Sequence, residues 1–221
     1  MTEFIHLKDN NDWLQKRMAD LESKQVRNFL KVDRETIEIN DTTYKVQYVY
    51  MPAEIVKSTH TFQNNYFTIN IGKANGVEKD MGVFGVNGVV GTIYRANEYY
   101  SIVKSCLTEN INIAAMIEES GEHGFLKWDG KDPRRGSLSG ISNDREVKKW
   151  SKVITRGSAG TFPKGLPIGK VESTTPIEGK PLWDVKVLFA EDYRRIQRVF
   201  VIKNLLRDEQ LDLEKGLNDP Q

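Results

Sequence analysis

The sequence reads TINIGKANGVEKDMG at residues 68–82, continues with VVGTI at 89–93, and later reads VITRGSAGTFPKGLPIGKV at 153–171. In both segments an alternating strand ends at a glycine, a turn of small residues follows, and an apolar residue, Val77 or Phe162, leads into a second β-branched run. Repetition over this length indicates two similar β modules in tandem. A doubled β module with almost no catalytic residue types favours a scaffold over an enzyme.

The rest of the body also consists of short strands. Alternating runs rich in β-branched and aromatic residues recur at a spacing of roughly ten residues, which is typical of a sandwich or barrel. We therefore predict a mainly β protein, with an N-terminal helix or short coiled coil over residues 1–32, a first β module over 33–118, a second over 119–205 and a polar tail over 206–221. The sequence leaves open whether one module takes a strand from the other segment.

Composition excludes several classes of function. The chain has 221 residues with 32 basic and 31 acidic side chains, a net charge of +1, and its basic residues are scattered. Such a chain lacks the basic patch of a nucleic-acid-binding protein. Its single cysteine, Cys106, excludes an internal disulfide framework and a CxxC site, and its apolar neighbours predict a buried small side chain.

The N-terminal segment has a helical pattern from about Asn11 to Leu30. Leucines recur every seven residues at Leu7, Leu14 and Leu21, with Met18 on the adjoining row of the same face. A narrow seam with a polar second row suits a two-stranded coiled coil, and we predict that Leu14, Met18 and Leu21 mediate self-association. The alternative is a solvated helix that packs on its own domain.

The glycine-rich run at residues 82–91, GVFGVNGVVG, resembles a phosphate-binding loop only superficially. It lacks the terminal Gly-Lys-Ser/Thr, and a β-branched strand follows it rather than a helix N-terminus. Asn87-Gly88 between apolar residues instead predicts a hairpin with a type I′ turn.

Catalytic and metal-binding patterns are equally weak. His6, His60 and His123 are far apart and have no partner at metal-ligand spacing, and no serine stands in a nucleophile motif. The WDGKDPR segment at 128–134 contains two carboxylates, but Asp-Gly and Asp-Pro are also turn formers. We predict no catalytic residue, no metal site and no cofactor.

Ordered sequence blocks then point to a known family. The chain resembles the rod shape-determining protein MreC family in the blocks QNNYFTIN at 63–70, GV at 76–77 and DMGV at 80–83. The resemblance continues in GVVG at 88–91, in the segment from Phe125 to DPR at 132–134, in FPKGLPIG at 162–169 and in VFVIKN at 199–204.

The resemblance implies a fold and a role. It implies two small β-barrels in a chymotrypsin-like arrangement, and a non-catalytic scaffold of the cell-elongation machinery that binds and positions peptidoglycan synthases. Implied partners are the elongation-specific penicillin-binding transpeptidase, MreD, the MreB cytoskeleton and a second copy of the chain in a dimer or filament. The implied location is the periplasm, with an inner-membrane anchor that this chain lacks. The sequence of residues 63–70 is similar to that of Bacteroidetes members of the family.

Aromatic and arginine side chains dominate the energetics of protein interfaces, so they are the candidate partner contacts. These candidates are Trp128, Arg134, Arg135, Tyr193 and Arg194. Two alternatives to the scaffold stay open, a double-barrel serine-type hydrolase and a peptidoglycan-binding module.

Overall fold

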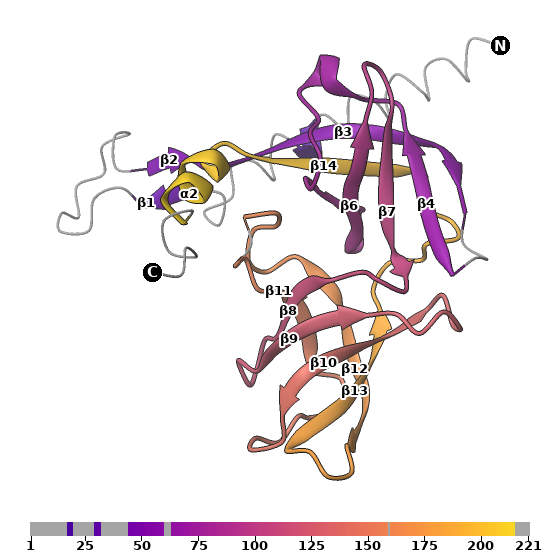
Figure 1. The fold of residues 1–221 in the computed structure, drawn as a ribbon, viewed down its shortest axis with the longest axis vertical. Coiled ribbons are helices and arrows are strands. Elements are labelled where there is room, and N and C mark those ends of the chain that lie inside the picture. Colours follow the sequence, from indigo (N-terminus) through magenta and orange to yellow (C-terminus); the bar gives the residue numbers. More distant parts are fainter. Residues whose placement is uncertain (1–16, 20–28, 32–43, 60–62, 159, 215–221) are drawn as a thin grey trace, which may run out of the picture.

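The computed structural model describes residues 17–19, 29–31, 44–59, 63–158 and 160–214, and it is mainly β. Six strands form a first closed barrel, shown at the top of Figure 1. They are β3 (Tyr48–Ser58), β4 (Asn64–Ile69), β5 (Gly82–Phe84), β6 (Val89–Ala96), β7 (Ser101–Thr108) and β14 (Arg198–Asn204). Every hydrogen-bonded pair of these strands is antiparallel.

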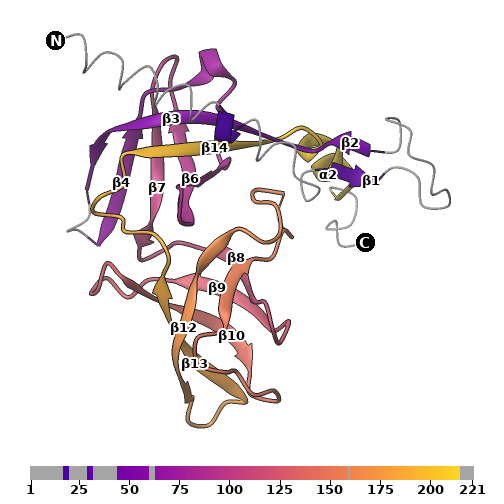
Figure 2. The same cartoon turned by 180° about the vertical axis from the view of Figure 1, so that it is seen from behind.

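A second closed barrel of six antiparallel strands lies below the first, and Figure 2 shows the same arrangement from behind. Its strands are β8 (Ile113–Ile117), β9 (His123–Lys127), β10 (Arg135–Ser142), β11 (Lys152–Thr155), β12 (Pro167–Pro176) and β13 (Leu182–Phe189). The predicted mainly β, double-barrel fold is therefore confirmed.

The two barrels share one strand order once the first is read from β14. Around the first barrel the order is β14-β3-β4-β7-β6-β5, and around the second it is β8-β9-β10-β13-β12-β11. Both orders correspond to strands 1-2-3-6-5-4 if β14 takes the place of β8. The first barrel is thus a circular permutation of the second, and the last strand of the chain closes it.

The structure keeps the predicted duplication but shifts it by one strand. The sequence comparison aligned β4 with β11, whereas the strand order makes β5 the counterpart of β11 and β6 the counterpart of β12. Register supports this pairing, since Val83 lies opposite Gly91 and Val153 lies opposite Gly169. A Cβ on either glycine would collide with a backbone oxygen of the next strand, that of Lys104 or Leu188. The same close approach of strands therefore explains both glycines.

The predicted module boundaries change accordingly. β8 lies before the predicted boundary at residue 118, yet it pairs with β9 and β11 of the second barrel. β14 lies in the predicted second module but pairs with β3 and β5 of the first. The second barrel is consequently inserted between β7 and β14, and two short segments connect it to the first.

The N-terminal prediction is only partly within the described residues. A helical turn covers Arg17–Ala19, and the remainder of the predicted helix up to residue 28 lies outside the described residues. β1 (Phe29–Lys31) corrects the predicted end of the helix, because it pairs with β2 (Tyr44–Val46). The predicted polar tail contains α2 (Arg207–Glu214), a short helix without buried residues.

A hairpin loop of the first barrel docks on the segment between β13 and β14, where the chain leaves the second barrel. The loop between β5 and β6 places Asn87 against the buried carboxylate of Glu191, which accepts from the Asn87 backbone N–H at 3.1 Å and from Nδ2 at 3.3 Å. The Tyr193 hydroxyl donates to the carbonyl of Val89 at 2.9 Å. A Cβ on Gly88 would lie 2.6 Å from the Pro167 carbonyl oxygen, so the loop backbone itself contacts β12.

The predicted hairpin at Asn87-Gly88 is confirmed, but the prediction of a type I′ turn is wrong. A type I′ turn requires positive φ at both central residues, and neither Asn87 nor Gly88 has a positive φ. The loop instead spans Gly85 to Gly88, with the Gly85 N–H donating to the Gly88 carbonyl at 2.7 Å. Contacts to Glu191 stabilise this wider loop in place of a tight turn.

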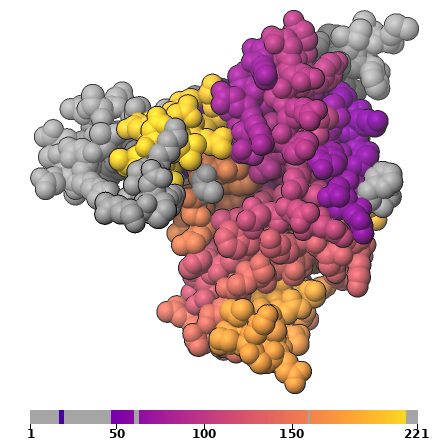
Figure 3. All heavy atoms as spheres, in the orientation of Figure 1, coloured from indigo at the N-terminus to yellow at the C-terminus, as the bar shows by residue number. Residues whose placement is uncertain are grey.

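A second contact joins the barrels through the loop before β12. The Phe162 ring lies over Gly82, where a Cβ would come within 2.6 Å of Phe162 Cε1 and of the Thr161 carbonyl oxygen. Close by, Asn204 Nδ2 donates to the Gly160 carbonyl at 3.0 Å. Figure 3 shows the atoms of the first barrel in contact with those of the second. The β5–β6 loop therefore contacts β12 and the segment after β13, and the Phe162 ring over Gly82 forms a separate contact between the barrels.

Changing Gly82 to alanine tests the importance of this junction. The added methyl group must displace the Phe162 ring and the Thr161 backbone, and overpacking of this kind costs about 1–3 kcal/mol. Urea unfolding should show a loss in that range for Gly82→Ala. Val86→Ala, at a 69% exposed position two residues beyond β5, is the control and should change stability little. Equal stability of both variants and the parent would show that the contact over Gly82 is dispensable.

Candidate interaction surfaces

Two of the predicted contact residues are buried. Trp128 is 5% exposed and donates its Nε1–H to the Asp132 carbonyl at 2.9 Å. Tyr193 is 2% exposed, packs edge-on against Phe189 at 5.2 Å, and its burial raises the pKa of its hydroxyl. Neither ring offers contact area to a partner in this conformation, because each supports a loop or the barrel junction.

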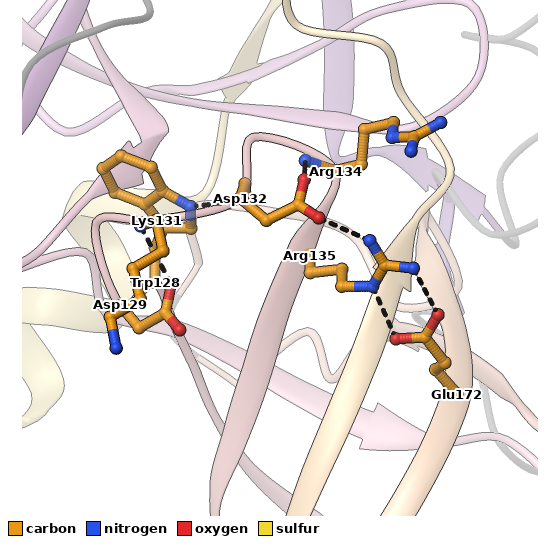
Figure 4. A network of polar contacts seen from close by, with 7 residues as sticks. All are labelled: Trp128, Asp129, Lys131, Asp132, Arg134, Arg135 and Glu172. Atoms are coloured by element: carbon orange, nitrogen blue, oxygen red, sulfur yellow. Dashed lines mark hydrogen bonds and ion pairs between the residues drawn. The ribbon is translucent and has the colours of Figure 1, made fainter.

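Arg135 is held by carboxylates of its own barrel. Its Nε and Nη2 donate to the two carboxylate oxygens of Glu172 at 2.7 and 2.8 Å, and its Nη1 donates to Asp132 (Figure 4). Donation by the Arg134 backbone N–H, and then by Arg135, lowers the pKa of Asp132; Arg135 also lowers the pKa of Glu172. Bidentate geometry fixes the guanidinium in place, so Arg135 braces β10 against β12.

Arg134 and Arg194 are exposed, as a partner contact requires. The Arg134 side chain points away from the network in Figure 4, and among the described residues no carboxylate pairs with it. Arg194 pairs with Asp192 at 3.2 Å on the segment between β13 and β14. Exposed ion pairs contribute little stability, so both guanidinium groups can exchange their contacts for those of a partner.

Of the predicted self-association residues, only Met18 is described. Its side chain is 42% exposed, whereas the adjacent Ala19 is buried. Leu14 and Leu21 lie outside the described residues. The seam stays a prediction.

Sequence reasoning missed a basic groove on the first barrel. It has a volume of about 650 Å³ and runs between the segment 73–79 and β6. Three basic side chains and one acidic side chain line it together with the exposed ring of Tyr94: Lys73, Lys79, Arg95 and Glu78. These residues come from separate parts of the sequence, and only the closed barrel brings them together.

Sequence reasoning also missed Trp150, which lies just before β11. Its side chain is 52% exposed, and Lys149 Nζ lies 5.1 Å from the ring centroid. Its backbone has a φ of 70°, which is rare for a bulky residue. The KKW sequence at 148–150 is a signal that could have pointed to this position.

Within the part of the chain that the structure describes, no group of three or more His, Cys, Asp or Glu side chains is placed to hold a metal ion. His123, the one described histidine, lies exposed on β9. Cys106 is fully buried, as predicted, and burial raises the pKa of its thiol to about 12. A thiol with that pKa is not a nucleophile at neutral pH.

No helix within the described ranges has the length and apolar character needed to cross a membrane.

Comparison with known proteins agrees with this architecture. The family model "Rod shape-determining protein MreC, barrel core" matches residues 55–203. The cell shape-determining protein MreC of Listeria monocytogenes is 26% identical over 175 residues, which cover 77% of this chain and 58% of the relative. The MreC of Bacillus subtilis is 32% identical over 148 residues, or 61% of this chain and 50% of the relative. The chain therefore spans about half the length of the curated relatives it matches.

Solved structures support the fold. A structure of MreC from Listeria superposes with a TM-score of 0.68 at 22% identity, covering 92% of this chain and 91% of the other. The complex between penicillin-binding protein PBP2 and MreC from Helicobacter pylori contains a chain that superposes with a TM-score of 0.57 at 16% identity, covering 72% and 99%. At these identities the superpositions establish the double-barrel fold. With the family model matching most of the chain, from β3 to β14, this chain belongs to the MreC family of rod shape-determining proteins.

Proposed function

We propose that this chain is a non-catalytic scaffold of the cell-elongation machinery, which binds and positions a penicillin-binding transpeptidase. The observation that carries the proposal is the complex of PBP2 with MreC from Helicobacter pylori, whose fold this chain shares. Family membership supports a role in cell shape. The elongation-specific transpeptidase is the partner that fits both observations.

The architecture suits a scaffold. The two closed barrels contain no free sheet edge that could add a partner's strand, so recognition by the barrels takes place through loops and side chains on their outer surfaces. Hydrogen bonds and packing at Asn87, Tyr193 and Gly82 join the barrels, so loops on both are held at fixed separations. Such preorganisation reduces the entropy lost when a partner binds.

The proposal includes a location and further partners. The chain lies outside the cytoplasm, anchored to the inner membrane by a segment that is not among its described residues. MreD and the MreB cytoskeleton act through that anchor, and a second copy joins through the N-terminal seam. Membership of the rod shape-determining protein family supports this arrangement. Each contact is open to measurement.

Binding of the chain to the extracytoplasmic part of its own cell's elongation transpeptidase is the direct test. We expect a dissociation constant of about 10 μM or tighter by biolayer interferometry, since interfaces of standard size span micromolar to picomolar affinities. Arg134→Glu and Arg194→Glu should each weaken binding, mainly by slowing association. Lys180→Glu, the same charge change in the exposed turn between β12 and β13, is the matched control.

Two results would count against the scaffold. One is the absence of transpeptidase binding, particularly if the chain instead sediments with purified sacculi. The other is clean single-site labelling by a serine-directed covalent probe, which a hydrolase would show.

Self-association through the N-terminal seam is tested by placing charge on it. Leu14→Asp combined with Leu21→Asp should convert a dimer into a monomer, because carboxylates in an apolar seam cannot be paired by the facing helix. Light scattering across a dilution series measures the mass. Lys16→Asp combined with Ser23→Asp, at solvent-facing positions of the same predicted heptads, is the control. A dimer that survives the leucine changes would place the interface elsewhere.

A further inference from the structure

The backbone at Trp150 adopts a conformation that its side chain disfavours. The Ser151 N–H donates to the Lys148 carbonyl at 3.3 Å and closes a four-residue turn. Within that turn only the third residue, Trp150, has a positive φ, at 70°. This is the pattern of a type II turn, whose third position selects glycine or asparagine because other side chains collide with the backbone. A tryptophan there is strained.

Backbone hydrogen bonds to β12 impose this strain. The Trp150 N–H donates to the Val171 carbonyl at 2.8 Å, and the Val171 N–H donates to the Ser151 carbonyl at 2.9 Å. These bonds extend the pairing of β11 with β12, so they fix the backbone whatever side chain the turn carries. Glycine would satisfy the same bonds without strain.

The indole ring is not required by the core. It is 52% exposed, whereas Trp128 is 5% exposed and Trp183 donates its Nε1–H to the Arg145 carbonyl at 3.1 Å. The other non-glycine residue with a positive φ among the described residues is Asp80, a type that tolerates this region. Trp150 therefore carries strain at a place where neither backbone nor packing needs its ring.

Two exposed lysines precede the ring. No carboxylate within the described ranges forms an ion pair with Lys148 or Lys149. Lys149 lies over the ring at 5.1 Å. On the neighbouring strand, Glu172 is held by the bidentate Arg135; hydrogen bonds from Arg135, and then the charge of Lys149, lower the pKa of Glu172. The surface thus presents an aromatic side chain beside two exposed cations without an ion pair.

We infer that Trp150 is the anchor through which the second barrel docks on the transpeptidase, with its indole in an apolar pocket whose rim carries carboxylates for Lys148 and Lys149. This inference rests on the proposed function and adds a site to it. Tryptophan is enriched among the few residues that dominate interface energies, where it fills desolvated pockets. An acidic rim is the complement of the two lysines. A net charge of only +1 argues against a polyanion as the occupant, since it provides no wider basic field.

Two substitutions separate the ring from the strain. Trp150→Ala removes the ring and keeps a Cβ at positive φ, whereas Trp150→Gly removes both. Tyr99→Ala is the control, because Tyr99 is 68% exposed on the first barrel. Thermal unfolding and biolayer interferometry against the transpeptidase are measured for all four proteins, including the parent.

If the inference holds, both Trp150 variants weaken binding at least about tenfold, as truncation of a central anchor does, and Tyr99→Ala stays within about twofold of the parent. Trp150→Gly should also melt about 2–4 °C above Trp150→Ala, through relief of the strained φ, and no lower than the parent. Lys148→Glu combined with Lys149→Glu should slow association.

Three outcomes overturn the inference. Unchanged binding by both Trp150 variants removes the anchor and leaves the proposed function standing. A melting temperature of Trp150→Gly well below that of the parent makes the ring a packing residue. A parent chain that does not bind the transpeptidase removes the proposed function and this site with it.

Discussion

The structure depends on the docking of one hairpin of the first barrel onto the segment that leaves the second. Asn87 binds the buried carboxylate of Glu191 through its backbone and its side chain, and Tyr193 binds the carbonyl of Val89 from the same segment. An unpaired carboxylate would be costly at such a buried position, so the hairpin and the segment stabilise each other. Because β14 follows this segment and closes the first barrel, closure of that barrel and placement of the second barrel are coupled.

This coupling matters for the proposed scaffold role. A scaffold contributes by holding surfaces at set separations, and the inserted second barrel is tied to the first by two connections and by packing of Phe162 over Gly82. The braced pair of Arg135 with Glu172 stiffens the outer face of the second barrel. Trp150 lies just before β11, which pairs with the strand that carries Glu172, so its position relative to the first barrel is also fixed.

The sequence predicted the β class, the duplication and the hairpin because these depend on local patterns such as alternation and glycine placement. It aligned β4 with β11, because each of these strands leads to a glycine and a turn of small residues, whereas only the strand order around the barrels identifies β5 as the counterpart. β10 is hard to recognise from the sequence, because its two glycines and three serines hide the alternation; Phe189 packs where a Cβ on Gly136 would lie. Residue type alone does not reveal exposure, so the sequence selected Tyr193, which is buried, and did not select Trp150, which is 52% exposed and has a positive φ.

The contacts between the two barrels should hold them as one rigid body. Residual dipolar couplings of backbone amides in weakly aligned solution measure the orientation of each barrel separately. We expect a single alignment tensor to fit the strands of both barrels, β3 to β7 with β14 and β8 to β13 alike. Two tensors that differ in magnitude or orientation would show that the barrels reorient independently, and would contradict this expectation.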